Sequence, residues 1–423
     1  MRILQVSRIF PPLLTAQAIA VAKSAAALQE VGAGVHILCG TAFKQFREAP
    51  WSFPSPYTET RVSVAGYRLD TVARAFLDSP FAPFFPPTPW ALEAARKFSP
   101  SSHPENYDVI FATFGPVDSL QAALRIAEQR NLPLVLEFND PFPYSLQEVL
   151  FEDKDYWVRL YRQKYTETWM RALLPRTSLF IVPSSRMKMS LVTYLVARGY
   201  AGKPVEVVPH IGWGRDGGPA RKANAKVVIS HLGSFYSRRK GGKEHFIRSA
   251  LPFLRALVRV IKEVPDIANS LEVRFVGGLD VPSREFVSRN ALENLVVVEP
   301  PVDYAASLEK MHEADVLLLL GEEIPASPFL PIKFADYVIT RKPMLALCPL
   351  DSEVADIMGR RFGVVADIHS LDSMAEQIKH VWRTWMRGAL DTLRVPEEIS
   401  QEFGSKAIGR RYLDAFEIAI RSR

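Results

Sequence analysis

Three features of the sequence predict an α/β protein made of two doubly wound domains. Short runs rich in Val, Ile and Leu alternate with longer stretches of helical periodicity. The runs are continuously apolar, as in strands that are covered on both faces and therefore belong to parallel sheets. The chain has 423 residues, which is more than one ordinary hydrophobic core holds, so two domains are expected.

Thirteen apolar runs are the predicted strands, and the stretches between them are long enough for helices in right-handed crossovers. The runs cover residues 2–9, 34–40, 61–69, 107–115, 132–140, 178–185 and 205–211 in the first half, and residues 226–233, 271–278, 295–300, 315–321, 344–348 and 362–367 in the second.

The first predicted helix covers residues 15–31. Its apolar stripe, with residues three or four apart, is Ala18, Val21, Ala25 and Leu28. Gly32 is expected to follow the end of this helix, because glycine readily adopts the left-handed conformation found there.

A segment poor in apolar residues, "GWGRDGGPARKAN" at 212–224, is a predicted linker. It separates an N-terminal domain at 1–211 from a C-terminal domain at 225–400. The last segment, 401–423, is predicted to form a helix that packs back on the first domain.

Composition and charge narrow the function classes. Hydrophobic residues make up 48% of the chain and the mean hydropathy is +0.01, which favours a soluble globular protein. No apolar run approaches the ~20 residues of a membrane span, and no signal peptide is expected. The net charge of +6 is dispersed, which suits phosphorylated substrates or an anionic membrane surface, or carries no specific meaning. Nucleic acid is the least favoured partner because no binding motif occurs.

The cysteines and histidines give no sign of a metal or a disulfide. Cys39 and Cys348 lie at the ends of predicted strands in opposite halves, so we expect two reduced core thiols in a cytoplasmic protein. The eight histidines have no metal-ligand spacing, so no bound metal and no cofactor are expected.

One stretch, "SPFAPFFPPTPW" at 79–90, holds five prolines and four aromatic residues and is not expected to form a regular element. It is either a rigid surface loop or a loop that contacts the acceptor or a membrane.

Positive charge gathers after the first strand of the second domain, in "LGSFYSRRKGGK". Gly233 permits close backbone approach, and a helix beginning near 241–244 would present free N–H groups. Arg238, Arg239 and Lys240 add cations that bind phosphate. The segment is therefore either a diphosphate site or a solvated basic turn.

A second group of charged residues follows the strand at 315–321. Lys333, Asp336 and Tyr337 share one face of a predicted helix. A carboxylate there could accept hydrogen bonds from ribose hydroxyls, whereas the simpler alternative is a surface ion pair. The glycine patterns of dinucleotide-binding and P-loop proteins are absent, so a dehydrogenase and a P-loop NTPase are disfavoured.

These segments resemble a known family. "LPIKFADYVITRKPMLAL", "KVVISHLGSFYSRRK", "HEADVLLLLG" and "GPVDSLQAALRIAEQRNLPLVLEFNDPF" are similar to segments of glycosyltransferase family 4. The resemblance implies the GT-B fold, in which two doubly wound Rossmann-like domains face each other across a cleft. It also implies an acceptor-binding N-terminal domain and a C-terminal domain that binds a nucleotide sugar.

By this resemblance the residues at the donor are Gly233, Ser234, Arg238, Arg239, Lys240, Lys333, Asp336 and Tyr337. Asp336 stands where the family binds ribose, and the cations stand near the diphosphate. Thr15, Gln17 and Gly115 are expected near the acceptor, with helix capping as the alternative role for the first two. Asp140 is the candidate catalytic residue for sugar or acceptor contact, with turn capping as its alternative.

The resemblance implies sugar transfer from a UDP- or GDP-sugar to a hydroxyl of a glycan, a lipid-linked saccharide or a small molecule. Transfer would retain the anomeric configuration and need no metal. The expected location is cytoplasmic, with possible contact at the inner face of an anionic membrane. The sequence departs from the family pattern at Ser234, Pro328 and "TFGP" (113–116), where the family carries arginine, glutamate and histidine.

Two other functions therefore stay open. A non-catalytic nucleotide-sugar-binding or scaffold protein would fit the departures. A nucleotide-sugar epimerase of the same fold would need acid/base groups, for which His210, His231 and Asp140 are available without characteristic spacing.

Overall fold

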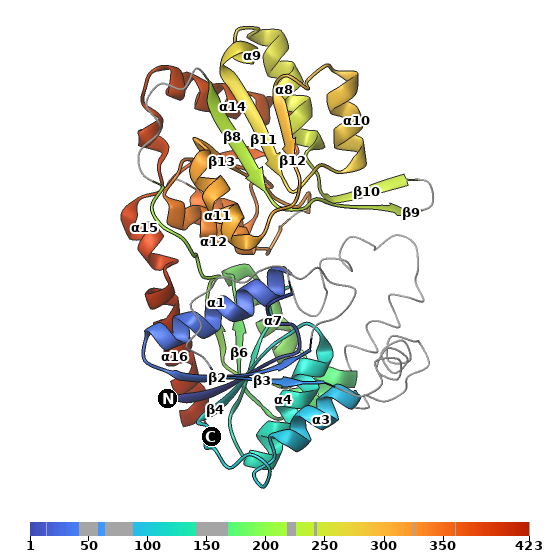
Figure 1. The fold of residues 1–423 in the computed structure, drawn as a ribbon, viewed down its shortest axis with the longest axis vertical. Helices are drawn as coiled ribbons and strands as arrows, with labels where there is room; N and C mark the ends of the chain where they lie inside the picture. Colours follow the sequence, from blue (N-terminus) through green and yellow to red (C-terminus); the bar gives the residue numbers. More distant parts are fainter. Residues whose placement is uncertain are drawn as a thin grey trace. The chain divides into compact units, whose positions relative to one another are not determined.

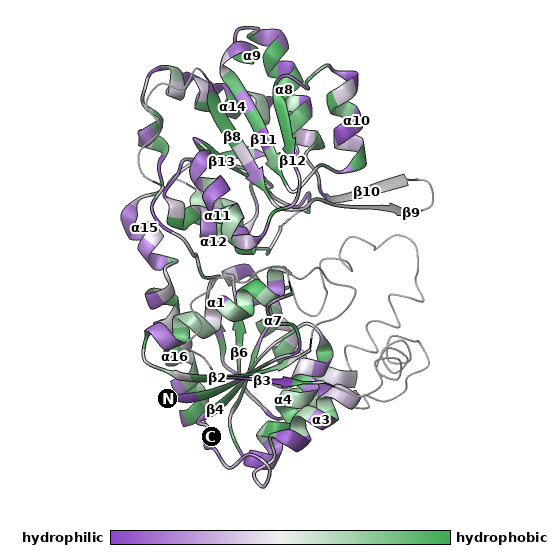
Figure 2. Cartoon of the chain, viewed as in Figure 1, coloured by the Kyte–Doolittle hydropathy of each residue, from purple (hydrophilic) through white to green (hydrophobic). Residues whose placement is uncertain are grey.

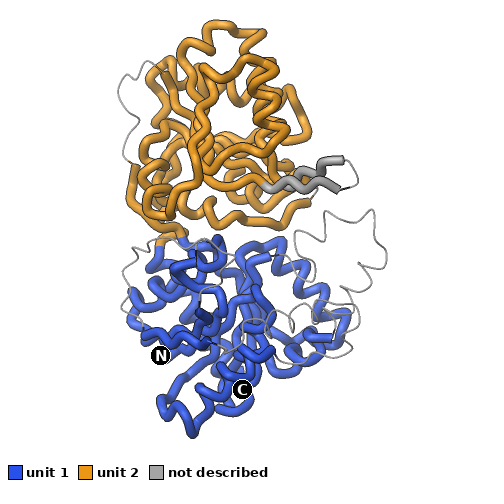
Figure 3. The backbone as a smooth tube through the Cα atoms, turned by 45° about the vertical axis from the view of Figure 1, so that its right-hand side comes forward, with its two compact units in different colours: residues 1–211, 405–423 blue, residues 212–404 orange. Residues whose placement is uncertain are grey.

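The computed structural model describes residues 1–13, 15–41, 58–63, 88–140, 168–217, 226–240, 243–324, 326–359 and 361–422, and within 236–247 it describes the backbone only. The chain forms two compact units (Figure 3). Unit 1 comprises residues 1–211 and 405–423, and unit 2 comprises residues 212–404. Among the described helices, none combines the length and the apolar character that crossing a membrane requires.

Unit 1 is built on a seven-stranded parallel sheet with the strand order β3-β2-β1-β4-β5-β6-β7 (Figure 1). The strands are β1 (Arg2–Ser7), β2 (Gly34–Gly40), β3 (Thr58–Val62), β4 (Val109–Thr113), β5 (Leu134–Glu137), β6 (Thr177–Val182) and β7 (Val205–Val207). The helices are α1 (Ala16–Glu30), α3 (Pro89–Lys97), α4 (Val117–Arg130), α7 (Ser185–Val196) and α16 (Ser405–Arg421).

Unit 2 is built on a six-stranded parallel sheet with the order β12-β11-β8-β13-β14-β15. The strands are β8 (Val227–Leu232), β11 (Leu271–Val276), β12 (Val296–Glu299), β13 (Val316–Leu320), β14 (Met344–Cys348) and β15 (Val364–Asp367). The helical elements are α8 (Leu251–Glu263), α9 (Ile267–Ser270), α10 (Val281–Arg289), α11 (Tyr304–Glu313), α12 (Ile332–Thr340), α13 (Glu353–Met358), α14 (Leu371–Met386), η1 (Leu390–Leu393) and α15 (Glu397–Glu402).

The predicted fold class is confirmed. Each of the thirteen apolar runs contains or overlaps one parallel strand, although β3 begins three residues before the predicted run. Central strands such as β4 and β13 are apolar over nearly their whole length (Figure 2), and every residue in them is buried. This is the reason that their sequences read as continuous apolar runs.

The first predicted helix is also confirmed, as α1. Ala18, Val21, Ala25 and Leu28 are all buried. Thr15 is the N-cap residue, and its side chain accepts the backbone N–H of Ala18 at 3.1 Å. Gly32, just beyond the helix, has φ +90°.

The basic segment after β8 does not start a helix, so this prediction is wrong. It forms an antiparallel hairpin of β9 (Tyr236–Lys240) and β10 (Lys243–Arg248), and α8 begins only at Leu251. The sequence explains the outcome, because two glycines between two short strand-forming runs are a signature of a two-residue hairpin turn.

Two other segments differ from their predicted character. The start of the predicted linker packs closely in unit 2, since a Cβ on Gly212 would lie 2.4 Å from the Ala335 carbonyl oxygen. Residues 218–224 lie outside the described part. The end of the proline-rich stretch begins α3, with Thr88 as N-cap and Trp90 buried, whereas residues 79–87 lie outside the described part.

The C-terminal helix α16 packs against α1 in unit 1 (Figure 1). Gly409 makes the approach possible, because a Cβ there would lie 2.4 Å from the carbonyl oxygen of Ala27. The hydroxyl of Tyr412 donates to the buried carboxylate of Glu137, which also accepts a hydrogen bond from Thr113 at 2.8 Å. Burial raises the pKa of Glu137.

Candidate functional site

The strand order of unit 2 identifies the edge at which a ligand is expected. The chain proceeds outward from β8 through β11 on one side and from β13 through β14 on the other. In open α/β sheets, ligands bind outside the carboxyl ends of the strands where the order reverses in this way. In unit 2 this switch point lies between the ends of β8 and β13.

Two glycines shape the backbone at the switch point. Gly233 directly follows β8 with φ +123°, and Gly277 follows β11 with φ +120°. A Cβ on Gly277 would lie 2.6 Å from the carbonyl oxygen of Gly233, so the two turns pack against each other without side chains. A Cβ on Gly233 would lie 2.4 Å from Lys333 Nζ, so the absence of a side chain leaves room for an ammonium group.

Lys333, in the first turn of α12, reaches this turn. Its Nζ lies 3.4 Å from Nε2 of the fully buried His231 in β8. His231 Nδ1 donates to the Leu318 carbonyl at 3.0 Å, so Nε2 is the nitrogen that accepts from Lys333. Burial, together with neighbouring positive charge, lowers the pKa of both side chains.

Lys333 has no acidic partner among the described residues. The nearby carboxylate of Glu322, just after β13, raises the pKa of Lys333 and so partly offsets the effect of burial. Glu322 forms its ion pair with Arg248 at the end of β10 and not with Lys333. Both members of that pair are largely buried. The site thus offers a partly buried ammonium group at a ligand-binding edge, and an anion would supply the missing counter-charge.

Asp336 and Tyr337 lie deeper than Lys333. The Asp336 carboxylate accepts the backbone N–H of Trp213 at 2.9 Å and the hydroxyl of Tyr304 at 3.0 Å. Burial and this carboxylate raise the pKa of Tyr304. The Tyr337 hydroxyl accepts the Leu232 N–H at 3.0 Å, at the end of β8. Asp336 therefore fixes the backbone at Trp213, and Tyr337 fixes the backbone at the end of β8.

The predicted donor residues are thus only partly brought together. Gly233 and Lys333 lie in contact, and Ser234 is exposed beside them in sequence. Asp336 and Tyr337 are buried in the same helix. Arg238, Arg239 and Lys240 lie in β9, where the side chains are outside the described part.

Sequence reasoning missed Glu322, Arg248 and the pairing of His231 with Lys333. Glu322 follows a predicted strand directly, so the rule for strand ends could have found it. Arg248 ends a hairpin that was not predicted. His231 was considered only as an acid/base group, and its contact with Lys333 joins residues 102 positions apart, which no local pattern encodes.

Unit 1 has its own switch point, between β1 and β4. Here Gln17 Nε2 donates to the carbonyl of Phe114 at 3.0 Å and also to that of Gly115. Gly115 has φ +104°, and a Cβ there would lie 2.6 Å from Gln17 Oε1. Two of the predicted acceptor residues are therefore in contact, while Thr15 caps α1.

A buried ion pair lies at the same edge. Arg8, directly after β1, pairs with Asp118 in the first turn of α4, and its guanidinium carbon lies 5.6 Å from the ring centre of Trp90. The Arg8 backbone N–H donates to Ser119 Oγ at 2.9 Å. Asp140 is exposed just beyond the carboxyl end of β5. The ion pair between Arg8 and Asp118 joins the β1 and β4 sides of the switch point.

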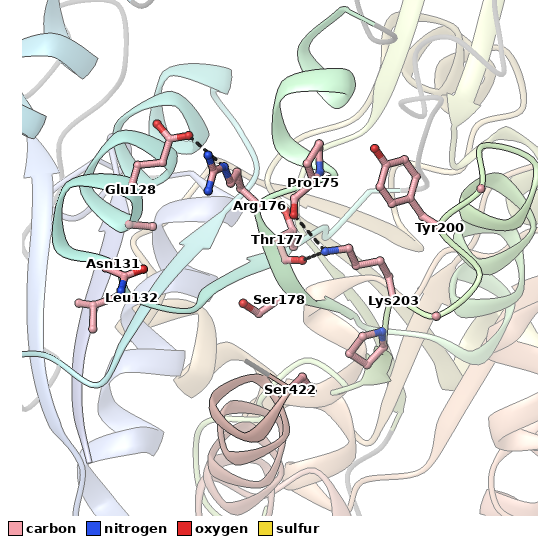
Figure 4. A pocket seen from close by; sticks show the side chains of 14 residues that line it. Glu128, Asn131, Leu132, Pro175, Arg176, Thr177, Ser178, Tyr200, Lys203 and Ser422 are labelled. Atoms are coloured by element: carbon pink, nitrogen blue, oxygen red, sulfur yellow. Dashed lines mark hydrogen bonds and ion pairs between the residues drawn. The ribbon is translucent and has the colours of Figure 1, made fainter.

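A separate pocket of about 610 Å³ lies at the opposite edge of the unit 1 sheet (Figure 4). It is lined by the start of β6 and the end of α4, and Lys203 Nζ there donates to the carbonyls of Pro175 and Thr177 at 3.3 and 2.5 Å. Because it lies at the amino ends of the strands, it is not where this fold binds its substrates.

Comparison with known proteins agrees with these features. Residues 18–211 match the model of the family described as Glycosyltransferase Family 4. No curated protein matches the chain by sequence.

Solved structures share the architecture over the whole chain. Sucrose-phosphate synthase from Thermosynechococcus elongatus is 15% identical, with a TM-score of 0.57 over 100% of this chain and 97% of that one. HepE from Anabaena, solved with UDP and glucose, is 14% identical, with a TM-score of 0.60 over 99% of each chain. UDP-GlcNAc 2-epimerase from Methanocaldococcus jannaschii is 10% identical, with a TM-score of 0.50 over 98% of each chain.

At these identities the structures establish the fold, and the family match adds the class of enzyme. The chain is a glycosyltransferase of the GT-B type, so both predictions are confirmed. The match to Glycosyltransferase Family 4 covers residues 18–211 only.

Proposed function

We propose that this enzyme transfers a sugar from a nucleoside diphosphate donor to a hydroxyl acceptor, with the donor held by unit 2 and the acceptor by unit 1. One observation carries the donor assignment. Lys333 places an ammonium group without an acidic partner, among the described residues, over the bare backbone of Gly233 at the switch point. A diphosphate is the ligand that this combination of charge and open backbone suits best.

In this proposal the cations act on the leaving group. Cleavage of the bond between sugar and diphosphate builds negative charge on the phosphate oxygens, and fixed cations stabilise that charge without a metal ion. Lys333 supplies one cation, and Arg238, Arg239 and Lys240 supply the others. Ser234 and the backbone after Gly233 contribute hydrogen bonds to the phosphates.

Asp336 is proposed to bind the ribose hydroxyls, and Tyr337 to hold the end of β8 in place beneath the donor. The Asp336 carboxylate already accepts from Trp213 and Tyr304, so ribose would share it with these groups. The donor nucleotide is proposed to be UDP or GDP.

The acceptor is proposed to contact Gln17 and Gly115, with Thr15 fixing the start of α1. The acceptor class is a glycan or a lipid-linked saccharide, and the location is the cytoplasm with contact at an anionic membrane surface. Transfer is proposed to retain the anomeric configuration, with a phosphate oxygen of the leaving group taking the acceptor proton. Asp140 would then orient the sugar or the acceptor.

A thermal-shift panel of UDP, GDP, CDP, ADP and their sugars, run with a chelator, tests the donor site. A ligand at 100 times its dissociation constant stabilises by about 2.7 kcal/mol, which corresponds to a rise of roughly 5–10 °C for a unit of this size. We expect UDP or GDP to give this rise, and R239A and D336N to lose most of it. Lys262→Met, on the exposed surface of α8, is the matched control for loss of one positive charge.

The epimerase alternative is supported by the shared fold with UDP-GlcNAc 2-epimerase. Turnover separates the three candidates. A glycosyltransferase releases nucleoside diphosphate only when an acceptor is present, an epimerase converts its nucleotide sugar without an acceptor, and a scaffold protein binds without turnover. Either of the last two results would contradict the proposed reaction.

A further inference from the structure

Unit 1 carries a cluster of metal-ligating side chains that the proposed reaction does not use. His36 lies in β2, and His103 and Glu105 lie in the segment 98–108 that joins α3 to β4. One ligand atom from each side chain lies within 4.8 Å of the other two. The nearest approaches are 3.8 Å between His36 Nδ1 and Glu105 Oε2, and 3.6 Å between His103 Nε2 and the same oxygen.

The cluster lies at the amino-terminal edge of the sheet, away from the switch point. His36 is the third residue of β2 and pairs with Leu4, the third residue of β1. Asp108, directly before β4, exchanges hydrogen bonds with Arg2 at the start of β1. A ligand here would therefore not compete with a sugar donor or acceptor.

The spacing of the three ligand atoms suits a zinc ion. Bonds of about 2.0–2.1 Å in a tetrahedral shell place neighbouring ligand atoms roughly 3.3 Å apart. The two nitrogen–oxygen distances of 3.8 and 3.6 Å are close to this value. The two imidazole nitrogens lie within 4.8 Å of each other and would move together by up to about 1.5 Å when an ion binds. Two imidazoles and one carboxylate are a ligand set that zinc uses, with a fourth position left open. Glu105 is 60% exposed and His103 is 20% exposed, which leaves a path from solvent.

The nitrogen of His36 that faces the cluster is Nδ1, which in the ion-free protein lies 2.8 Å from the Tyr107 hydroxyl. The other nitrogen, Nε2, lies 2.9 Å from Thr60 Oγ1, and donation to that hydroxyl leaves the lone pair on Nδ1. A neutral imidazole is the form that binds a metal.

The hydroxyl of Tyr107 holds both imidazoles in place without a metal. It lies 2.8 Å from His36 Nδ1, 2.7 Å from His103 Nε2 and 3.5 Å from Glu105 Oε2. It therefore stands next to both nitrogens at the open side of the set. An ion entering the cluster would replace these hydrogen bonds with bonds to the metal.

The segment that carries two of the ligands is fixed by Arg130 at the end of α4. Its guanidinium donates to the carbonyls of Phe98 at 2.7 Å, Glu105 at 2.9 Å and Ser99 at 3.4 Å, and also to that of His103. These bonds position the backbone of the ligands, so little ordering is left for the ion to impose. The Arg130 charge lies near the cluster, and the Glu105 carboxylate offsets it.

We propose that His36, His103 and Glu105 bind a divalent metal ion, Zn²⁺ in the first place, which fastens the segment 98–108 to β2 at the amino-terminal edge of unit 1. This site differs from the expectation of no bound metal, which rested on spacing in the sequence. His36 and His103 are far apart in the chain, so no local sequence pattern predicts that they lie together.

Zinc binding to the full chain tests the proposal. The protein is purified without a histidine tag, stripped with a chelator, titrated with ZnCl₂ by calorimetry, and assayed for metal after gel filtration. We expect one zinc per chain, a rise in the midpoint of thermal unfolding, and affinity lower by roughly tenfold or more in H103Q and E105Q. Cobalt(II) gives a second readout, because a tetrahedral site turns on intense visible absorption that both variants should lose.

Matched controls keep the result interpretable. His380 is exposed in α14 of unit 2, so H380Q removes a histidine without touching the cluster and should bind zinc like the natural chain. His103 and Glu105 are on the surface side of the cluster, so both variants should fold, which circular dichroism in metal-free buffer checks. Equal zinc binding in the natural chain, H103Q and E105Q would overturn the proposal, and so would no binding in the natural chain.

Discussion

Gly233 must be glycine for two physical reasons that act at the same position. Its φ of +123° lies in a region that side chains strain to adopt, and a Cβ would collide with Lys333 Nζ at 2.4 Å. The first reason concerns stability alone, whereas the second concerns the place of the cation. A substitution at Gly233 introduces both backbone strain and displacement of Lys333. A control glycine that has a positive φ but no close neighbour is therefore needed to separate these effects.

Gly233→Ala should abolish the stabilisation by UDP or GDP while the protein still folds. Backbone strain costs about 1–3 kcal/mol, and the new methyl group displaces Lys333 from the turn. Gly388→Ala is the matched control, since Gly388 has φ +66° and no heavy atom within 4 Å of the added Cβ. Thermal unfolding with and without nucleotide measures both effects. Retention of the full nucleotide shift in G233A would show that Lys333 does not act at this turn.

Lys333 also lowers the free energy of unfolding of the ligand-free protein. Burial lowers its pKa well below the ordinary value of 10.5, so between the two values the unfolded chain binds more protons than the folded chain. Stability therefore rises with pH across that window. A group of this kind is kept for function at the expense of stability.

Lys333→Met should make the ligand-free protein more stable at neutral pH by about 1–2 kcal/mol and remove its response to nucleotide. The difference in stability between the variant and the natural chain should shrink as the pH rises toward 10.5. Near that pH the lysine also loses its proton in the unfolded chain, so its deprotonation on folding no longer costs free energy. Urea unfolding at a series of pH values gives the comparison, with K262M as the surface control. A variant that is less stable at every pH would contradict the account.

At the scale of elements, the sequence predicted the strands and helices whose patterns lie within a short stretch of the chain. Thirteen strands were found because continuous apolar runs reflect burial on both faces, and α1 was found because its stripe repeats at the helical period. The hairpin β9–β10 was missed because its glycine pair suits either a helix start or a hairpin turn. The contact between Lys333 and His231 joins residues 102 positions apart, and no local pattern encodes such a pair.

The packing of α16 on α1 depends on one position. Gly409→Ala places a methyl group 2.4 Å from the Ala27 carbonyl oxygen, and backbone cannot yield as a side chain can. We expect a loss of about 1–3 kcal/mol in the free energy of unfolding, measured by urea denaturation. Gly202→Ala is the control, because nothing lies within 4 Å of its added Cβ. Equal midpoints for the two variants would show that α16 does not need this close approach.

At the scale of the molecule, each large apolar cluster among the described residues belongs to a single unit. The apolar cluster around β1, β4 and β5 contains residues of unit 1 only, and the two clusters on either face of the unit 2 sheet contain residues of unit 2 only. Each unit should therefore unfold with its own cooperative transition. A ligand that binds one unit then raises one transition.

Calorimetry on the full chain should accordingly resolve two transitions that respond to different additions. G409A lowers the transition of unit 1 and so identifies it. UDP or GDP should raise only the other transition, and K333M should remove that effect; zinc should raise only the transition of unit 1, and H103Q should remove that effect. Failure of the nucleotide response with an intact zinc response would reject the donor site alone, and the reverse would reject the metal site alone. One transition that moves with both additions would show instead that the two units unfold as one, because binding to either core would then stabilise the whole chain.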